Sequence, residues 1–182
     1  MATALRLEVA HAVLYVHDVA DMIEFYTNTL GFEVTDRGPL GNDEIVFLSQ
    51  NVRDHHQVAF ITGRGVPQPS NSMNHIAFRS SGTLDDLRAF KKTLAADDRV
   101  TQIVPLTHGN AWSVYFRDPE FNGVEVFIDT PWHVRQPQGE PLDLDKSNDE
   151  IVETTRAHFS GEPEFGPIDE FYSRRAAHRN ER

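Results

Sequence analysis

The chain has 182 residues, no cysteine and a formal net charge of −11 at neutral pH. This length suits one domain or two small repeated modules, and the negative field disfavours nucleic acid and anionic membranes as partners. Because sulfur ligands and disulfides are excluded, any metal site must use nitrogen and oxygen donors.

The first half of the chain has the pattern of a β-α-β-β-β module, over about residues 5–63. Residues 5–17 alternate as a strand with His11 in its middle, and Asp18 is a suitable N-cap for the helix that follows and that Gly31 ends. Three further strands are predicted over residues 32–35, 44–48 and 57–62, separated by turn-rich pieces at 37–39 and 41–43.

The same order of elements then repeats after a linker at residues 63–72. The second module, about 73–130, starts with a strand that contains His75, and Thr83 can cap its helix. Three more strands are predicted near residues 101–105, 111–117 and 123–128. Since 75 − 11 = 64, the two histidines mark the period of an internal duplication, which predicts an α+β fold built from two tandem βαβββ modules.

Residues 131–182 differ from the modules in composition. A proline-interrupted arm is followed by helices predicted over 148–159 and 168–177. We therefore divide the chain into a domain of residues 1–130 and a C-terminal extension of residues 131–182. This extension is expected either to wrap over the modules or to meet a second subunit.

One carboxylate stands out in the second module. Glu125 lies in an alternating strand among Val124, Val126, Phe127 and Ile128, where an ionised group is costly unless a positive charge holds it. We interpret this charge as a metal ion. His11 and His75, at corresponding positions of the two modules, are the other predicted ligands.

Three segments resemble the vicinal oxygen chelate superfamily: HAVLYV, NHIAF and SVYFRDPEFNGVEVF. The resemblance implies that the paired modules form a curled mixed sheet around a metal cup. It is closest to a short form of the type I extradiol catechol dioxygenases, and it implies Fe(II), or Mn(II), held by His11, His75 and Glu125, with O2 as co-substrate. Two imidazoles and one carboxylate leave part of the coordination sphere open, as this chemistry requires.

Two further motifs carry the resemblance into the catalytic residues. DHHQVAF is similar to a family segment whose second histidine acts as acid and base, which implies this role for His56, although His55 remains an alternative. The pattern HG(x)5Y implies that His108 and Tyr115 contact the substrate. The turn at residues 118–122 departs from the family, because Phe121 stands where a glycine is usual.

Related functions differ in their ligands. Glyoxalases and epimerases of this superfamily typically use a second carboxylate from the last strand of the first module. The repeat places the equivalent of Glu125 there at 125 − 64 = 61, which is Ile61, so the absence of an acid counts against these enzymes. Fosfomycin-type metal-dependent thiol transferases share the three ligands and are the alternative enzyme. A non-catalytic small-molecule binding module is the alternative from another class.

These observations predict an extradiol dioxygenase that cleaves a catechol or 2,3-dihydroxybiphenyl type of substrate. Its partner is then a small aromatic diol, and we expect a homo-oligomer that binds neither nucleic acid nor membrane. No secretion signal and no apolar run of bilayer length is evident, so a soluble cytoplasmic protein is expected.

Overall fold

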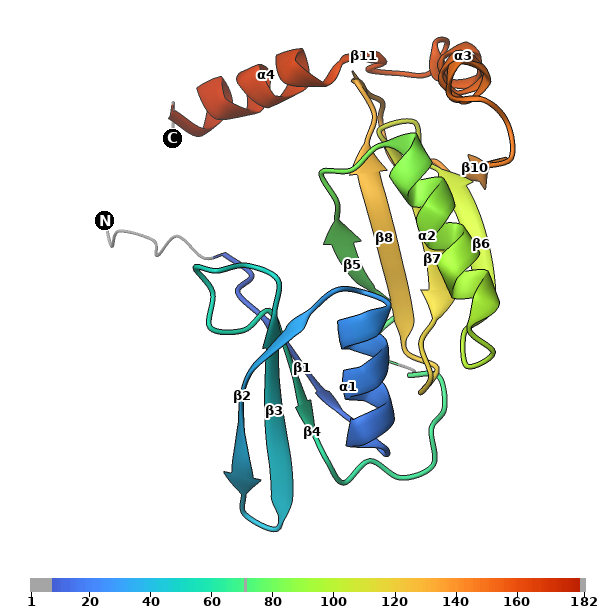
Figure 1. Cartoon of the computed structure of the whole chain (residues 1–182). Coiled ribbons are helices and arrows are strands. Elements are labelled where there is room, and N and C mark those ends of the chain that lie inside the picture. Colours follow the sequence, from blue (N-terminus) through green and yellow to red (C-terminus); the bar gives the residue numbers. More distant parts are fainter. Residues whose placement is uncertain (1–7, 71, 181–182) are drawn as a thin grey trace. The chain divides into compact units, whose positions relative to one another are not determined.

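The computed structural model describes residues 8–70 and 72–180, which divide into two compact units. The first unit runs through Pro69 and includes Pro119–Phe121, and the second holds Ser70–Asp118 and the chain from Asn122 onward. Figure 1 shows one sheet with one helix against it in each unit. The division of the chain at residue 130 stays a prediction.

The first unit is a four-stranded mixed sheet with the order β1-β4-β3-β2. β1 pairs in parallel with β4, and the other pairs are antiparallel. Its elements are β1 (Ala12–Tyr15), α1 (Val19–Asn28), β2 (Glu33–Leu40), β3 (Asp43–Ser49) and β4 (Val58–Ile61). The predicted module is thus confirmed, with a first strand shorter than expected because only residues 12–15 pair; residues 5–7 lie outside the described part.

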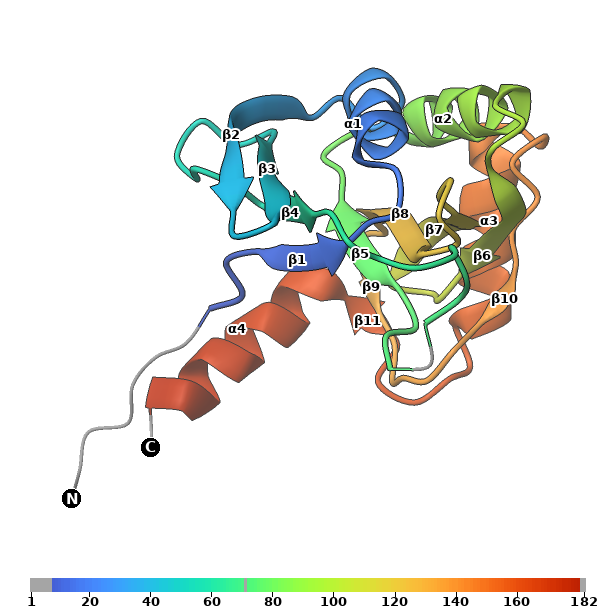
Figure 2. The same ribbon diagram turned by 90° about the horizontal axis from the view of Figure 1, so that it is seen from below.

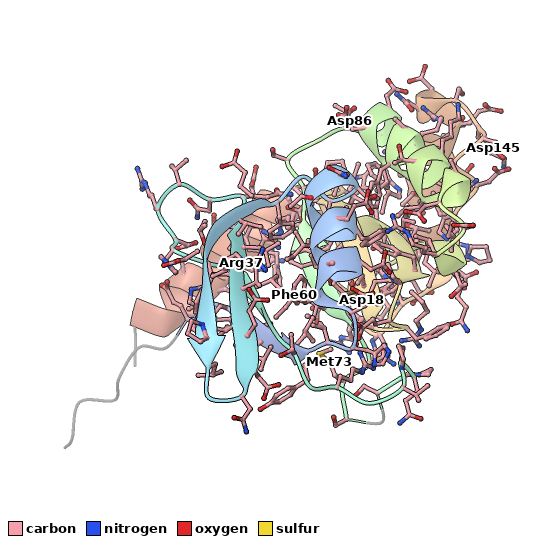
Figure 3. The ribbon with its side chains drawn as sticks, turned by 60° about the horizontal axis from the view of Figure 1, so that its bottom comes forward. Asp18, Arg37, Phe60, Met73, Asp86 and Asp145 are labelled. Carbon is pink, nitrogen blue, oxygen red and sulfur yellow. The ribbon has the colours of Figure 1, made fainter. Side chains whose placement is uncertain are left out.

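The helix of this unit begins where the sequence predicts. The Asp18 carboxylate accepts hydrogen bonds from the backbone N–H groups of Ala20 and Asp21, which would otherwise lack partners in the first turn. Tyr26 then packs edge-on against Phe60 of β4, with 4.9 Å between ring centroids, and both are fully buried. Figure 3 labels Asp18 at the start of α1 and Phe60 beside this helix.

The piece at residues 37–39 was predicted as a turn, and this is wrong. Arg37, Gly38 and Pro39 lie inside β2 and pair with residues 44–46 of β3. β2 is the edge strand of its sheet, so Pro39 can occupy it without breaking a ladder on both sides. The turn itself is at Gly41, whose φ is +66°.

The second unit repeats this topology. Its sheet has the order β10-β6-β7-β8-β5, in which β5 pairs in parallel with β8 as β1 does with β4. The elements are β5 (Ile76–Arg79), α2 (Leu84–Ala96), β6 (Thr101–Thr107), β7 (Ala111–Arg117) and β8 (Gly123–Asp129). Thr83 caps α2 as predicted, and Figures 1 and 2 both show α2 over one face of the sheet. The predicted duplication and the α+β fold are therefore confirmed.

The C-terminal residues pack onto this second unit. They form β9 (Trp132–His133), β10 (Glu140–Pro141), α3 (Asn148–Phe159), β11 (Gly166–Pro167) and α4 (Ile168–Asn180). β10 extends the sheet at the edge of β6, and the Trp112 indole N–H donates to the Thr155 hydroxyl of α3 over 2.9 Å. Leu144 and Phe159 are fully buried, so this extension contributes to the core of its unit.

The turn at residues 118–122 has Phe121 in the place where the family usually has glycine. Asn122 N–H donates to the Asp118 carboxylate over 2.9 Å, and Phe121 adopts φ of +63°. Within this turn, the buried Glu120 carboxylate accepts hydrogen bonds from the backbone N–H groups of His17 and Asp18, just before α1. The Arg64 guanidinium also donates to this carboxylate, over 3.2 Å.

In residues 8–70 and 72–180, no helix has the length and apolar character needed to span a bilayer.

Candidate metal centre

Glu125 is held at both of its carboxylate oxygens in the second unit. It lies on β8 directly opposite Tyr115 of β7, and its side chain is 9% exposed. One oxygen accepts the Ser113 hydroxyl over 2.6 Å, and the other is 3.1 Å from His75 Nε2. The buried carboxylate is therefore fixed by neighbours on the same face of the sheet, as the alternation predicts.

His75 precedes β5, and the parallel pairing of β5 with β8 brings it to Glu125. Its Nδ1 lies 2.7 Å from the Asn74 side-chain oxygen. A contact of this kind at one ring nitrogen commonly orients the other toward a metal. Two ligand atoms that are each about 2.1 Å from one ion at a right angle lie roughly 3 Å apart, so the His75 and Glu125 atoms fit a shared divalent cation.

The predicted triad is represented in the second unit by this pair. His11, the third predicted ligand, belongs to the first unit. Within residues 8–70 and 72–180, the side chains of histidine, aspartate and glutamate form no group of three or more that could hold a metal ion. The ligand set His11, His75 and Glu125 therefore stays a prediction, of which the structure brings two members together.

Tyr115 and His108 form a second contact beside the His75–Glu125 pair. The Tyr115 hydroxyl is 2.9 Å from His108 Nε2, and the Tyr115 ring stands edge-on to the His75 ring. Burial, and then the neighbouring Glu125 carboxylate, raise the pKa of Tyr115 well above its usual range. Tyr115 is thus a neutral proton donor beside the His75–Glu125 pair.

A recess of about 130 Å³ lies beside these residues in the second unit. His75 and Tyr115 contribute to its wall, together with Asn74, Gln102 and Arg117. The Arg117 guanidinium reaches the Gln102 side-chain oxygen over 3.2 Å. His75 and Tyr115 therefore border a hollow that is lined by both polar and apolar groups.

The remaining predicted residues lie together in the first unit. The rings of His11 and His56 are 4.2 Å apart between centroids, and Phe47 lies 4.8 Å from His56. Burial, followed by repulsion from His11 and His55, lowers the pKa of His56. His55 is more exposed, and its Nε2 lies 3.8 Å from an Asp36 oxygen.

The residue equivalent to Glu125 in the first unit differs from the predicted Ile61. Glu125 pairs with Ala77 of β5, and the matching residue of β1, Val13, pairs with Ala59. The first module is two residues shorter before its last strand, so the period of 64 residues does not hold there. The equivalent residue is still apolar, and it supplies no second carboxylate.

Sequence reasoning did not assign a role to Ser113, Asn74 or Gln138. Strand alternation already places Ser113 on the face of Tyr115, so its contact with Glu125 could have been anticipated. Gln138 contributes its backbone carbonyl, which accepts from His108 Nδ1 over 2.5 Å. No side-chain pattern can reveal a partner of that kind.

The fold defines a protein of two tandem βαβββ modules, and the comparisons agree. The model of the glyoxalase/bleomycin resistance protein/dioxygenase superfamily matches residues 8–126. The chain belongs to this superfamily.

One relative by sequence is a dioxygenase. The chain is 34% identical over 126 residues to biphenyl-2,3-diol 1,2-dioxygenase 3 of Rhodococcus globerulus, a match that covers 66% of this chain and 62% of the relative. It therefore spans less than two thirds of that protein's length.

Solved structures share the fold. A glyoxylase/bleomycin resistance protein/dioxygenase domain from Frankia sp. EAN1pec has a TM-score of 0.58 at 19% identity, over 69% of this chain and all of that one. The fosfomycin resistance protein FosX of Listeria monocytogenes, solved with Mn(II) and sulfate, has a TM-score of 0.52 at 18% identity, over 71% and 95% of the two chains.

Proposed function

We propose that this protein is an extradiol dioxygenase that opens the ring of a catechol-type substrate and adds both atoms of O2 to it. The observation that carries the proposal is the contact of the buried Glu125 carboxylate with His75, beside a neutral Tyr115 that touches His108. The similarity to a biphenyl-2,3-diol dioxygenase supports catechols that carry an aryl group as the substrate class.

His11, His75 and Glu125 would hold Fe(II) in this proposal. Two neutral imidazoles and one carboxylate are the donor set typical of non-haem Fe(II) oxygenases, and the chain has no cysteine that would favour a softer metal. When bound, Fe(II) would supply the electron transfer between the catecholate and O2.

The side chains around the His75–Glu125 pair would accept and donate the protons of the reaction. A catechol must lose protons when it binds, and His108 Nε2, 2.9 Å from the Tyr115 oxygen, can accept one through the Tyr115 hydroxyl. Tyr115 can also donate a hydrogen bond to a substrate oxygen without adding charge. His56, which lies against His11 in the first unit, would return a proton as the ring opens.

The balance of the reaction needs no further reductant. The reaction breaks the ring bond between one hydroxylated carbon and its neighbour that carries no hydroxyl. Both oxygen atoms of O2 end in the product. The ring supplies the four electrons that O2 takes up, and the product is a muconic semialdehyde type of compound.

Anaerobic reconstitution with Fe(II), followed by exposure to a panel of catechols in air, tests this proposal. We expect O2 uptake and a yellow ring-fission product, with 2,3-dihydroxybiphenyl among the substrates. Parallel assays offer fosfomycin with a thiol, and measure bound metal. Thiol transfer without ring cleavage would support the transferase instead, and a chain that retains no metal would support a binding module.

A further inference from the structure

Both ring nitrogens of His108 have a partner. Nδ1 lies 2.5 Å from the backbone carbonyl oxygen of Gln138, and Nε2 lies 2.9 Å from the Tyr115 hydroxyl. A carbonyl oxygen can only accept, so Nδ1 must carry the hydrogen. In the neutral ring Nε2 is then the atom without hydrogen, so it can accept a hydrogen bond from the Tyr115 hydroxyl.

The Gln138 carbonyl is placed by a segment without regular pairing. Residues 134–139 connect β9 to β10 and belong to neither strand. The segment passes close to the imidazole, since a Cβ on Gly139 would lie 3.9 Å from His108 Nδ1. Something other than a strand ladder must therefore hold the carbonyl against the ring.

The side chain of Gln136 makes this connection. Its oxygen accepts the Gln138 backbone N–H over 2.9 Å, and its amide nitrogen donates to the His108 backbone carbonyl over 2.8 Å. The same nitrogen is 3.2 Å from the Asn110 side-chain oxygen and 3.4 Å from the Val134 carbonyl. The Gln136 amide group thus connects the backbone of His108 with the backbone of Gln138, whose carbonyl accepts a hydrogen bond from the His108 ring.

We propose that Gln136 is a positioning residue that fixes His108 as the Nδ1–H tautomer, so that Nε2 is the proton acceptor at Tyr115. The role of His108 in this statement rests on the proposed function. As a substrate hydroxyl passes its proton to the Tyr115 oxygen, the Tyr115 proton moves to Nε2. The ring becomes an imidazolium whose Nδ1–H still bonds Gln138.

The chain offers a matched control at Gln138. Its side-chain nitrogen points to the Arg135 carbonyl, at 3.2 Å, and to a Glu162 oxygen, at 3.4 Å. The bond to His108 uses only the backbone carbonyl, which an alanine retains. Gln138→Ala therefore removes an equally large amide side chain from the same segment and leaves the proposed connection in place.

The tautomer can be measured by NMR on the full chain with 15N-labelled histidine, freed of metal ions with a chelator, at a pH where His108 is neutral. A His108→Gln variant assigns the His108 signals among those of the 9 histidines. In the unaltered chain and in Gln138→Ala, we expect a protonated Nδ1 and an unprotonated Nε2. In Gln136→Ala, we expect the signals to move toward a mixture of the two tautomers.

Gln136→Glu provides a second, isosteric variant. It keeps an oxygen for the Gln138 N–H but loses the donor to the carbonyls of His108 and Val134, so we expect the same mixture. An Nε2–H tautomer in the unaltered chain would overturn the inference. Signals that stay unchanged in both folded Gln136 variants would overturn it as well.

Kinetics separate this inference from the proposed function. With Fe(II) and 2,3-dihydroxybiphenyl, kcat of Gln136→Ala should fall on the order of 10-fold while KM changes less, because only part of a general base's contribution is lost. Iron content should not change. If the unaltered chain cleaves no catechol but shows the Nδ1–H tautomer that both Gln136 variants lose, the proposed function fails and the assignment of Gln136 as the positioning residue stands.

Discussion

Glu125 illustrates how a single residue can reveal a site. An ionised carboxylate in an apolar strand is unfavourable, and the sequence alone predicts that a partner must stabilise it. The structure supplies that partner as His75, with Ser113 on the other oxygen. A metal ion would replace the direct contact between His75 and Glu125 with bonds from both to one cation.

Removal of either proposed ligand should abolish iron binding. His75→Ala and Glu125→Ala each take away one of a few metal–ligand bonds, and the remaining donors cannot hold the ion alone. Iron content after anaerobic reconstitution and desalting measures this, with Glu153→Ala on the exposed face of α3 as the control. Near-normal iron in either ligand variant would contradict the assignment.

His56→Ala should retain iron and slow ring cleavage by on the order of 10²-fold, because the proposed general acid and base is lost while the proposed ligands remain. Single-turnover measurement of product formation at saturating substrate tests this. The neighbouring His55→Ala is the comparison variant, since His55 is the alternative for this role and its Nδ1 lies 3.1 Å from His56 Nδ1. A larger loss in His55→Ala than in His56→Ala would transfer the proton-transfer role to His55.

At the scale of elements, strand alternation and helix caps were predictable because both depend on short stretches of sequence. Asp18 and Thr83 cap the two helices as expected. The edge strand β2 was not predicted in full, because a Gly-Pro pair usually marks a turn and only the tertiary position of β2 tolerates it.

Gly123 shows how tightly two elements approach. A Cβ at this position would lie 2.0 Å from the backbone oxygen of Asn74, next to the start of β5. Gly123→Ala should therefore destabilise the second unit by at least about 2 kcal/mol, since backbone must move.

Urea unfolding followed by tryptophan fluorescence measures this effect, because Trp112 and Trp132 both belong to the second unit. Gly161→Ala is the control, as no atom lies within 4 Å of its added Cβ. Equal midpoints for the two variants would show that β5 and β8 separate without cost.

At the scale of the whole molecule, the internal repeat predicted the topology of both units. The same order of strands, with the first strand parallel to the last, appears twice. What the repeat could not predict is the place of the C-terminal extension, because contacts such as the one between Trp112 and Thr155 join residues that no local pattern connects.

The extension should be essential to the stability of the second unit. Phe159 is fully buried, and a Cβ on Gly109 would lie 3.0 Å from its ring. Phe159→Ala should cost about 3–5 kcal/mol of unfolding free energy. Val152→Ala, on the exposed side of the same helix, should change it by less than about 0.5 kcal/mol. Similar unfolding curves for both variants would show that the extension is only peripheral.

The central proposal is that His11, His75 and Glu125 hold one iron ion. Diffraction at the iron absorption edge, from crystals grown with Fe(II) without oxygen, tests it most directly. We predict one anomalous peak per chain, bonded to these three side chains. A peak held by other residues, or no peak beside Glu125, would contradict the account.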